Sequence, residues 1–242
     1  MVGGWYLCGC NLHGSIPMAD IDDIMCGINV VNIVSVKQKI LLTGTCWYEL
    51  TGLWNLLTEQ GYDVYRVPLG YSCARHGWDL IIVALSAEPV AGWGRLFPQI
   101  REIRSQMSGK MITLVPERLK KMKVLFDVCL VYSGHVSLQQ LNDYISAILR
   151  CEITLRGRFQ LTDGQRRVLR YLGERDDDLS SLKREKHKPY YHYSRLVENV
   201  GVRDLRLLLM TGLDREIEYI INKSFKEKLM DNQHIGSNVL TP

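Results

Sequence analysis

From Lys39 onward, apolar positions along the chain follow two alternating patterns. Short continuous apolar runs indicate strands that are buried on both faces; these runs are Ile40–Leu42, Tyr62–Val67, Asp79–Leu85, Met111–Val115 and a segment within Val124–Tyr132. Segments with an apolar residue every three or four positions indicate amphipathic helices; these are Cys46–Gln60, Arg95–Met107, a short one over Glu117–Lys123, and Leu138–Leu149 behind a capping box of Ser137 and Gln140. Strands that alternate with helices predict a parallel, doubly wound sheet, and five strands in about 110 residues favour a flavodoxin-like, receiver-like α/β domain.

After residue 151 the strand pattern ends and only helical spacing continues. Further helices are expected behind a capping box of Thr162 and Gln165, over Tyr190–Val200 with Gly201 as its end, from Asp204 through Met210, and over Asp214–Met230. The chain is therefore divided into a poorly structured leader over residues 1–36, an α/β domain over 37–150, a small all-α domain over 151–215, and a C-terminal helix and tail over 216–242.

Composition places the chain among ordinary globular proteins. Apolar residues make up 46% of its 242 positions and charged residues 23%, which excludes disordered and collagen-like chains. No apolar stretch approaches the roughly 18 residues that a membrane-spanning helix needs, so no membrane partner is expected. The seven cysteines are odd in number, and the N-terminus lacks the pattern of a secretory signal, which predicts a cytoplasmic protein with reduced thiols.

Positive charge is concentrated in the C-terminal part of the chain. Between Arg156 and Arg206, 13 basic side chains oppose 8 acidic ones, an excess of 5 that exceeds the +4 of the whole chain. Basic and aromatic side chains there can contact phosphates and bases; the candidate DNA contacts are Lys183, Arg184, Lys186, Lys188, Tyr190, Tyr191, His192, Ser194 and Arg195. The alternative is a solvated surface with half-buried tyrosines. Asp176–Asp178 would repel phosphate, so this triplet is expected to face away from DNA or to contact a protein.

Signals for metal binding and for catalysis are weak. Cys8, Cys10 and His13 could supply three ligands, but no fourth stands at a zinc-site spacing, so a flexible leader without metal is expected. No glycine-rich phosphate loop, nucleophile elbow or zinc-protease motif occurs in the sequence. We therefore expect no enzyme activity, no cofactor and no small-molecule substrate.

Two motifs in the C-terminal part resemble a known family of transcription factors. The first is Leu161-Thr162 followed by Val168-Leu169, and the second is Val200-Gly201-Val202-Arg203, with His192 eight residues before Val200. Over residues 158–212 the chain resembles the helix-turn-helix of LuxR-type response regulators, and within them it resembles the FimY-like enterobacterial regulators of type 1 fimbriae. This resemblance implies promoter DNA as a partner, activation of a fimbrial operon, and a homodimer or a complex with another transcription factor.

The middle of this segment departs from the family pattern. The chain is about three residues shorter there, and Pro189 is acceptable only in the first turn of a helix, so the recognition helix is expected to begin near Lys188. Tyr191 and Arg195 then share one face of that helix, and Arg195 is the best candidate for contact with a base edge. The departure also supports an alternative function: a regulator that acts through protein contacts and whose helix-turn-helix does not bind DNA.

The α/β part resembles a receiver domain without its phosphorylation chemistry. A working receiver needs acidic residues after its first strand, an aspartate at the end of its third and a lysine after its fifth. This chain has Thr43-Gly44 and Ala84-Leu85 at the first two places, and no lysine between Lys123 and Lys183. Asp79 begins its strand and therefore lies at the opposite edge of the sheet. We expect control without aspartyl phosphorylation and a domain used for protein contacts.

Overall fold

The computed structural model describes residues 37–70, 77–151, 155, 159–173 and 189–221. These residues belong to one compact unit. The predicted leader over residues 1–36 and the tail beyond residue 221 lie outside the described residues, so both stay predictions. Within the described part of the chain, no helix is long and apolar enough to cross a bilayer.

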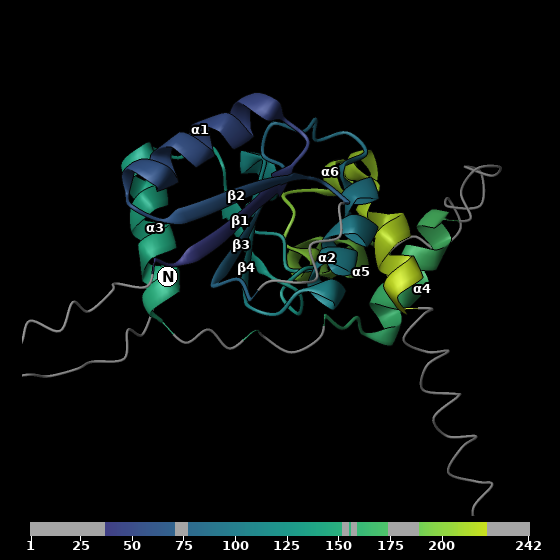
Figure 1. Cartoon of the computed structure of the whole chain (residues 1–242). Helices are drawn as coiled ribbons and strands as arrows, with labels where there is room; N and C mark the ends of the chain where they lie inside the picture. The colour runs from purple at the N-terminus through teal and green to yellow at the C-terminus, as the bar shows by residue number, and fades with distance from the viewer. Residues whose placement is uncertain (1–36, 71–76, 152–154, 156–158, 174–188, 222–242) are drawn as a thin grey trace, which may run out of the picture. The chain divides into compact units, whose positions relative to one another are not determined.

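The centre of the fold is a parallel five-stranded sheet in the order β2-β1-β3-β4-β5 (Figure 1). Its strands are β1 (Lys39–Gly44), β2 (Asp63–Pro68), β3 (Leu80–Ala84), β4 (Lys110–Val115) and β5 (Leu130–Ser133). Every residue of β3 is buried, as the continuous apolar run predicted. This strand order is that of the flavodoxin-like and receiver-like folds, which confirms the predicted class of the α/β part.

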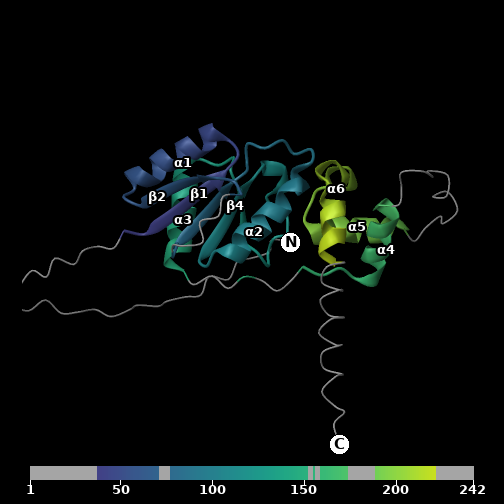
Figure 2. The same ribbon diagram turned by 45° about the vertical axis from the view of Figure 1, so that its right-hand side comes forward.

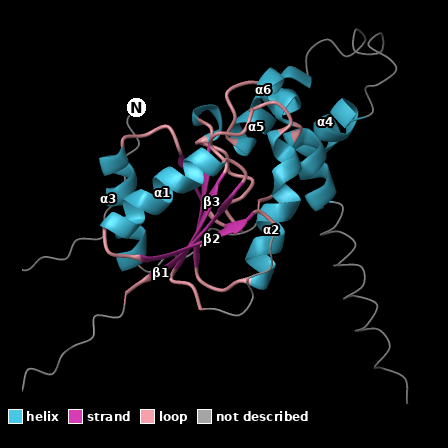
Figure 3. Ribbon diagram, turned by 45° about the horizontal axis from the view of Figure 1, so that its top comes forward, coloured by secondary structure: helices cyan, strands magenta, loops and turns pink. Residues whose placement is uncertain are grey.

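Helices α1 (Trp47–Glu59) and α3 (Leu138–Arg150) cover one face of this sheet (Figure 3). Their buried residues are Leu50, Leu53 and Leu57 of α1 and Leu141, Ile145, Ile148 and Leu149 of α3. The predicted capping box starts α3: the Ser137 hydroxyl accepts from the Gln140 amide, and the Gln140 side chain accepts from the Ser137 amide.

The other face of the sheet is covered differently. The short 3₁₀ helix η1 (Trp93–Leu96) leads into α2 (Phe97–Gln106), which packs on this face. Between β4 and β5, where a helix over Glu117–Lys123 was expected, the chain forms only the 3₁₀ helix η2 (Glu117–Leu119) and turns. The expectation fails because the backbone amides bond differently: Met122 donates to the Leu119 carbonyl, three residues back, and Lys123 donates to the distant Val200 carbonyl.

The C-terminal helices are α4 (Asp163–Gly173), α5 (Pro189–Val200), α6 (Leu205–Thr211) and a helical segment over residues 213–221 (Figure 2). The local signals in the sequence are confirmed at their ends. Pro189 occupies the first position of α5, and Gly201 follows it with a φ of 81°. The Asp204 carboxylate caps α6 by accepting from the Leu207 amide at 2.8 Å.

One continuous hydrophobic cluster, which we call the shared core, joins the sheet to the C-terminal helices. Two backbone hydrogen bonds connect the same regions: the Gly92 amide donates to the Met210 carbonyl at 2.9 Å, and the Lys123 amide donates to the Val200 carbonyl at 2.8 Å. The shared core includes Leu41, Ile81, Val83, Phe97, Ile100, Leu119 and Val124 from the α/β part and Leu169, Leu196, Val200, Leu208, Leu213 and Ile217 from the C-terminal helices. The C-terminal helices are therefore anchored to the α/β part through buried apolar surface.

Gly201 provides a test of this anchoring. A Cβ at Gly201 would lie 2.0 Å from the Lys121 carbonyl oxygen, whereas a Cβ at Gly61, whose φ is 87°, meets nothing within 4 Å. Both substitutions to alanine cost roughly 1–2 kcal/mol for the left-handed backbone. We expect Gly201→Ala to lower the free energy of unfolding further than Gly61→Ala, because the α5–α6 turn must also move away from Lys121. Urea denaturation measures both, and equal losses would contradict the close approach.

Candidate nucleic-acid interface

The side-chain amides of Gln165 and Asn199 form a small hydrogen-bond network that joins α5 to α4. Gln165, which is 6% exposed, donates from Nε2 to the Arg195 carbonyl at 3.0 Å and accepts from the Thr162 amide at 2.9 Å. The Asn199 side chain donates to Gln165 Oε1 at 3.2 Å and to the Gln160 carbonyl at 2.9 Å. Because buried amides are costly when unpaired, these bonds fix the position of α5 on α4.

Apolar packing supports the same arrangement. Leu196 and Val200 of α5 are fully buried in the cluster that contains Val168, Leu169 and Leu172 of α4, as the helical spacing predicted. A Cβ at Gly164 would lie 2.5 Å from the His192 ring, so the ring of His192 packs directly over the start of α4. The two helices form a pair whose inner faces are apolar and whose outer faces are polar.

The outer face of α5 carries the polar groups that could meet a ligand. Tyr191 is 58% exposed, and Ser194 and Arg195 are exposed beside it. Arg195 lies 5.4 Å from the centre of the Tyr191 ring and donates from Nε to the Tyr191 hydroxyl at 3.3 Å, which confirms that the two share a face. Its other contact is an ion pair with Glu198 at 2.8 Å. The hydrogen bonds to Tyr191 and Glu198 raise the pKa of Arg195, so the guanidinium is charged at every physiological pH.

The predicted contact residues fall into three groups. Tyr191, Ser194 and Arg195 come together on the exposed face of α5, whereas His192 is half-buried against α4. Tyr190 belongs to the first turn of α5, and its side chain lies outside the described part. Lys183, Arg184, Lys186 and Lys188 lie outside the described residues, so their role stays a prediction.

The structure adds basic groups that the list of contacts did not contain. Arg166, Arg167 and Arg170 are exposed on α4. At the other end of α5, Lys123 donates from Nζ to the Glu198 carbonyl at 3.2 Å, in addition to its backbone bond to Val200. Sequence spacing could not reveal this contact because the two residues are 75 positions apart.

The strand ends do not carry the groups of a phosphorylation site. Fully buried Ala84 ends β3, and Gly44 ends β1 directly beside it. Instead, the Glu49 carboxylate of α1 accepts from the Ser86 hydroxyl at 2.6 Å, from the Ser86 amide at 3.2 Å and from the Ala87 amide at 3.3 Å. The polar groups that follow β3 are therefore bonded to a carboxylate of the protein itself.

Within the described part of the chain, no group of three histidine, cysteine or acidic side chains is placed to hold a metal ion. Cys8, Cys10 and His13 lie outside the described residues.

Comparison with known proteins gives structural neighbours only. No family model matches the chain, and no curated protein matches it. A two-component response regulator from Clostridium difficile aligns with 47% of this chain and 97% of its own length, at 20% identity and a TM-score of 0.36. The RcsB response regulator of Salmonella typhimurium, described for conformational dynamism in DNA interaction, aligns with 71% and 96%, at 16% identity and a TM-score of 0.34.

A third neighbour is ChrA, the response regulator of a heme-sensing two-component system, which aligns with 74% of this chain and 98% of its own length at 12% identity and a TM-score of 0.31. The neighbours are thus response regulators. At these identities and TM-scores the likeness carries no argument about function, and the receiver-like fold rests on the strand order of the sheet.

The strand ends generate a direct prediction about phosphorylation. Incubation of the full chain with acetyl phosphate and Mg²⁺ is expected to leave its mass unchanged, because Ala84 offers no carboxylate and Glu49 is bonded to Ser86 and Ala87. Intact-mass spectrometry measures this, with an active receiver domain in the same buffer as the control. An acid-labile gain of about 80 Da, the mass of one phosphoryl group replacing a proton, would contradict it.

Proposed function

We propose that this protein is a DNA-binding transcriptional regulator and that α5 is its recognition helix. The observation that carries the proposal is the pairing of α4 and α5, in which buried Leu196 and Val200 turn the opposite face of α5, with Tyr191 and Arg195, toward solvent. This pair lies in the part of the chain that holds the excess of 5 positive charges. A helix of this kind fits the major groove of DNA, and its basic surroundings attract phosphates.

Arg195 is the residue that we propose for base recognition. Its guanidinium can donate two hydrogen bonds to O6 and N7 of guanine, and its position on the exposed face of α5 leaves it accessible. Its bond to Glu198 has to be exchanged for the bond to the base, so Glu198 opposes DNA binding both by competition and by its charge. Arg167 and Arg170 of α4, together with Lys186 and Lys188, supply phosphate contacts in this proposal.

The regulatory role follows from the sequence resemblance. Two local features support the proposed likeness to LuxR-type domains: Leu161 is buried before the capping box of α4, and Gly201 makes the turn after α5. We propose a cytoplasmic, non-enzymatic regulator that binds promoter DNA without a cofactor and activates a fimbrial operon independently of aspartyl phosphorylation.

A second candidate function has its own support. The C-terminal end of α5 is tied to Lys123, and Arg195 is paired within its own helix, which fits a regulator that acts by protein contacts alone. The two functions differ in their response to salt, because phosphate contacts release counterions and weaken steeply as salt rises.

We also propose that the protein self-associates through α1 and β2. Trp47 is 63% exposed and Tyr48 is 87% exposed on α1. The Arg66 guanidinium of the edge strand β2 lies 4.7 Å from the Trp47 ring centre and 4.9 Å from that of Trp54. Exposed aromatic side chains beside an arginine are typical of interface centres. A dimer also suits the two-fold symmetric half-sites that such regulators bind.

The proposed DNA interface can be tested at Arg195 and Glu198, the two partners of one ion pair. Arg195→Ala is expected to weaken binding to a specific duplex by about tenfold or more, because a base contact is lost. Glu198→Gln is expected to strengthen binding, because it frees Arg195 and removes a negative charge near the DNA. Fluorescence anisotropy with a duplex recovered from cells by cross-linking and immunoprecipitation measures both effects.

Each variant in this pair is the control for the other. Both break the same exposed ion pair, so any effect on stability has the same sign, whereas the effects on DNA affinity are opposite. If Arg195→Ala binds the duplex as tightly as the unchanged protein does, α5 does not contact the bases. The function through protein contacts alone is then favoured.

The proposed interface on α1 can be tested by measuring self-association of the full chain. Tyr48→Ala is expected to shift the sedimentation equilibrium toward the monomer, because it removes an apolar side chain from the proposed interface without disturbing the core. Tyr219→Ala, which removes another exposed tyrosine, is the matched control and is expected to sediment like the unchanged protein. A strictly monomeric unchanged protein, or equal effects of both substitutions, would refute the α1 interface.

A further inference from the structure

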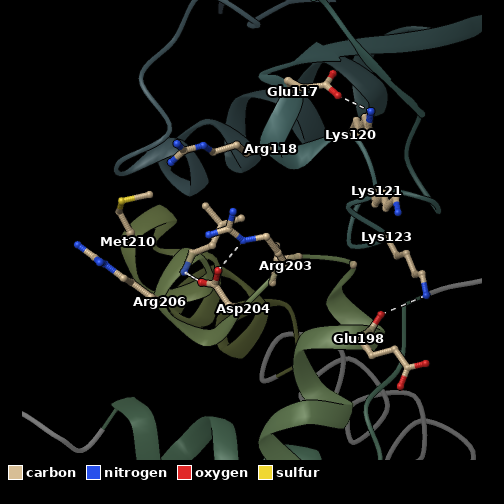
Figure 4. Close-up of a pocket in the computed structure, with 13 residues that line it drawn as sticks. Glu117, Arg118, Lys120, Lys121, Lys123, Glu198, Arg203, Asp204, Arg206 and Met210 are labelled. Carbon is tan, nitrogen blue, oxygen red and sulfur yellow. Dashed lines mark hydrogen bonds and ion pairs between the residues drawn. The ribbon is translucent and has the colours of Figure 1, made fainter.

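A pocket of about 790 Å³ opens between the connection from β4 to β5 and the turn from α5 to α6 (Figure 4). Pockets that bind small ligands have volumes of roughly 300–1,000 Å³. Arg118, from the β4–β5 connection, forms one side of this space, and Arg206 and Met210 of α6 face it from the other. The pocket is therefore built by two segments that are distant in sequence and held together by the shared core.

The lining is rich in positive charge. Six of its residues are cationic, namely Arg118, Lys120, Lys121, Lys123, Arg203 and Arg206, and three are acidic, namely Glu117, Glu198 and Asp204. An excess of cations around a common space creates a potential that favours an anion.

The acidic residues of the pocket are already engaged. Glu117 pairs with Lys120 and accepts from the Ser133 hydroxyl at 2.5 Å. These bonds lower the pKa of Glu117, which is therefore charged at neutral pH.

The other two acids are engaged in the same way. Asp204 pairs with Arg203 at 2.9 Å and caps α6, and Glu198 pairs with Arg195 outside the pocket at 2.8 Å. Among the described residues, Arg118, Lys121 and Arg206 have no carboxylate within ion-pair distance. These three cations thus line the pocket without a carboxylate as a direct partner.

We propose that this pocket binds a small organic polyphosphate, of the chemical class of a nucleoside di- or triphosphate. Arg118 and Arg206 would hold the phosphate groups, because guanidinium groups are strong donors to phosphate oxygens. Val202, Leu207 and Met210 provide an apolar part of the lining against which a base or another flat apolar group can pack. DNA phosphates follow an extended surface, whereas these cations surround a space bounded by two segments, which favours a small ligand.

The position of the pocket gives the ligand a defined effect. A ligand that contacts both Arg118 and Arg206 bridges the α/β part and α6, so it stabilises the arrangement in which the C-terminal helices are docked. Its binding adds to the stability of that arrangement in proportion to the logarithm of its concentration above Kd. This inference stands on the pocket alone and does not depend on DNA binding by α5.

The test is calorimetric titration of the full chain with ATP, pyrophosphate, AMP and adenosine. We expect saturable binding of one ATP per chain, weaker binding of AMP and of pyrophosphate, and no binding of adenosine. Arg118→Glu and Arg206→Glu are each expected to weaken ATP binding by tenfold or more. Arg215→Glu makes the same change of charge on an exposed residue of the helical segment over residues 213–221, outside the pocket, and is expected to leave ATP affinity unchanged.

The outcomes are decisive in both directions. Thermal denaturation without ligand checks that the exposed substitutions leave the fold intact. Absence of saturable ATP binding overturns the proposal, as does an equal loss in Arg215→Glu, which would indicate diffuse attraction. If duplex DNA displaces ATP and the pocket variants lose DNA binding, the cations belong to a DNA surface and the small-ligand site is refuted.

Discussion

Both faces of a parallel sheet must be covered by apolar surface, and in this protein that requirement ties the C-terminal helices to the α/β part. Leu41, Ile81 and Val83 point to the sheet face that belongs to the shared core. Among the described residues before 151, α2 is the only α-helix that packs in this core. From this face the cluster continues through the β4–β5 connection into α4, α5 and α6. Residues 37–150 alone would leave part of this apolar surface exposed, so experiments on self-association need the full chain.

This constraint links the proposed DNA interface to the fold. Among the described hydrogen bonds and ion pairs, none joins the side chains of Tyr191 and Arg195 to the α/β part. The C-terminal end of α5, in contrast, is fixed to the α/β part at Val200 and Gly201. Anything that moves the β4–β5 connection therefore also moves the C-terminal end of α5. The basic pocket lies at this junction, where a bound ligand would act on both parts at once.

Local signals predicted the elements well. The capping boxes at Ser137 and Thr162, the cap at Asp204 and the turn at Gly201 all depend on residues within a few positions of each other, and the structure confirms them. The strand order was also predictable, because alternating strands and helices permit few topologies.

Long-range contacts could not be predicted in this way. The bond from Lys123 to Glu198 and the bonds from Ser86 to Glu49 join residues that no spacing relates. The packing of His192 illustrates the same limit: no sequence spacing indicated that its ring lies against Gly164 at the start of α4, and its DNA contact stays a prediction.

The proposed function requires that the protein binds DNA in a sequence-dependent manner. The most direct measurement is the affinity of the full chain for a duplex recovered from cells and for a scrambled duplex of the same composition, each over a range of salt concentrations. We expect the recovered duplex to bind roughly a thousandfold more tightly at physiological salt and both affinities to fall steeply as salt rises. Equal affinity for the two duplexes, or binding that does not respond to salt, would contradict it.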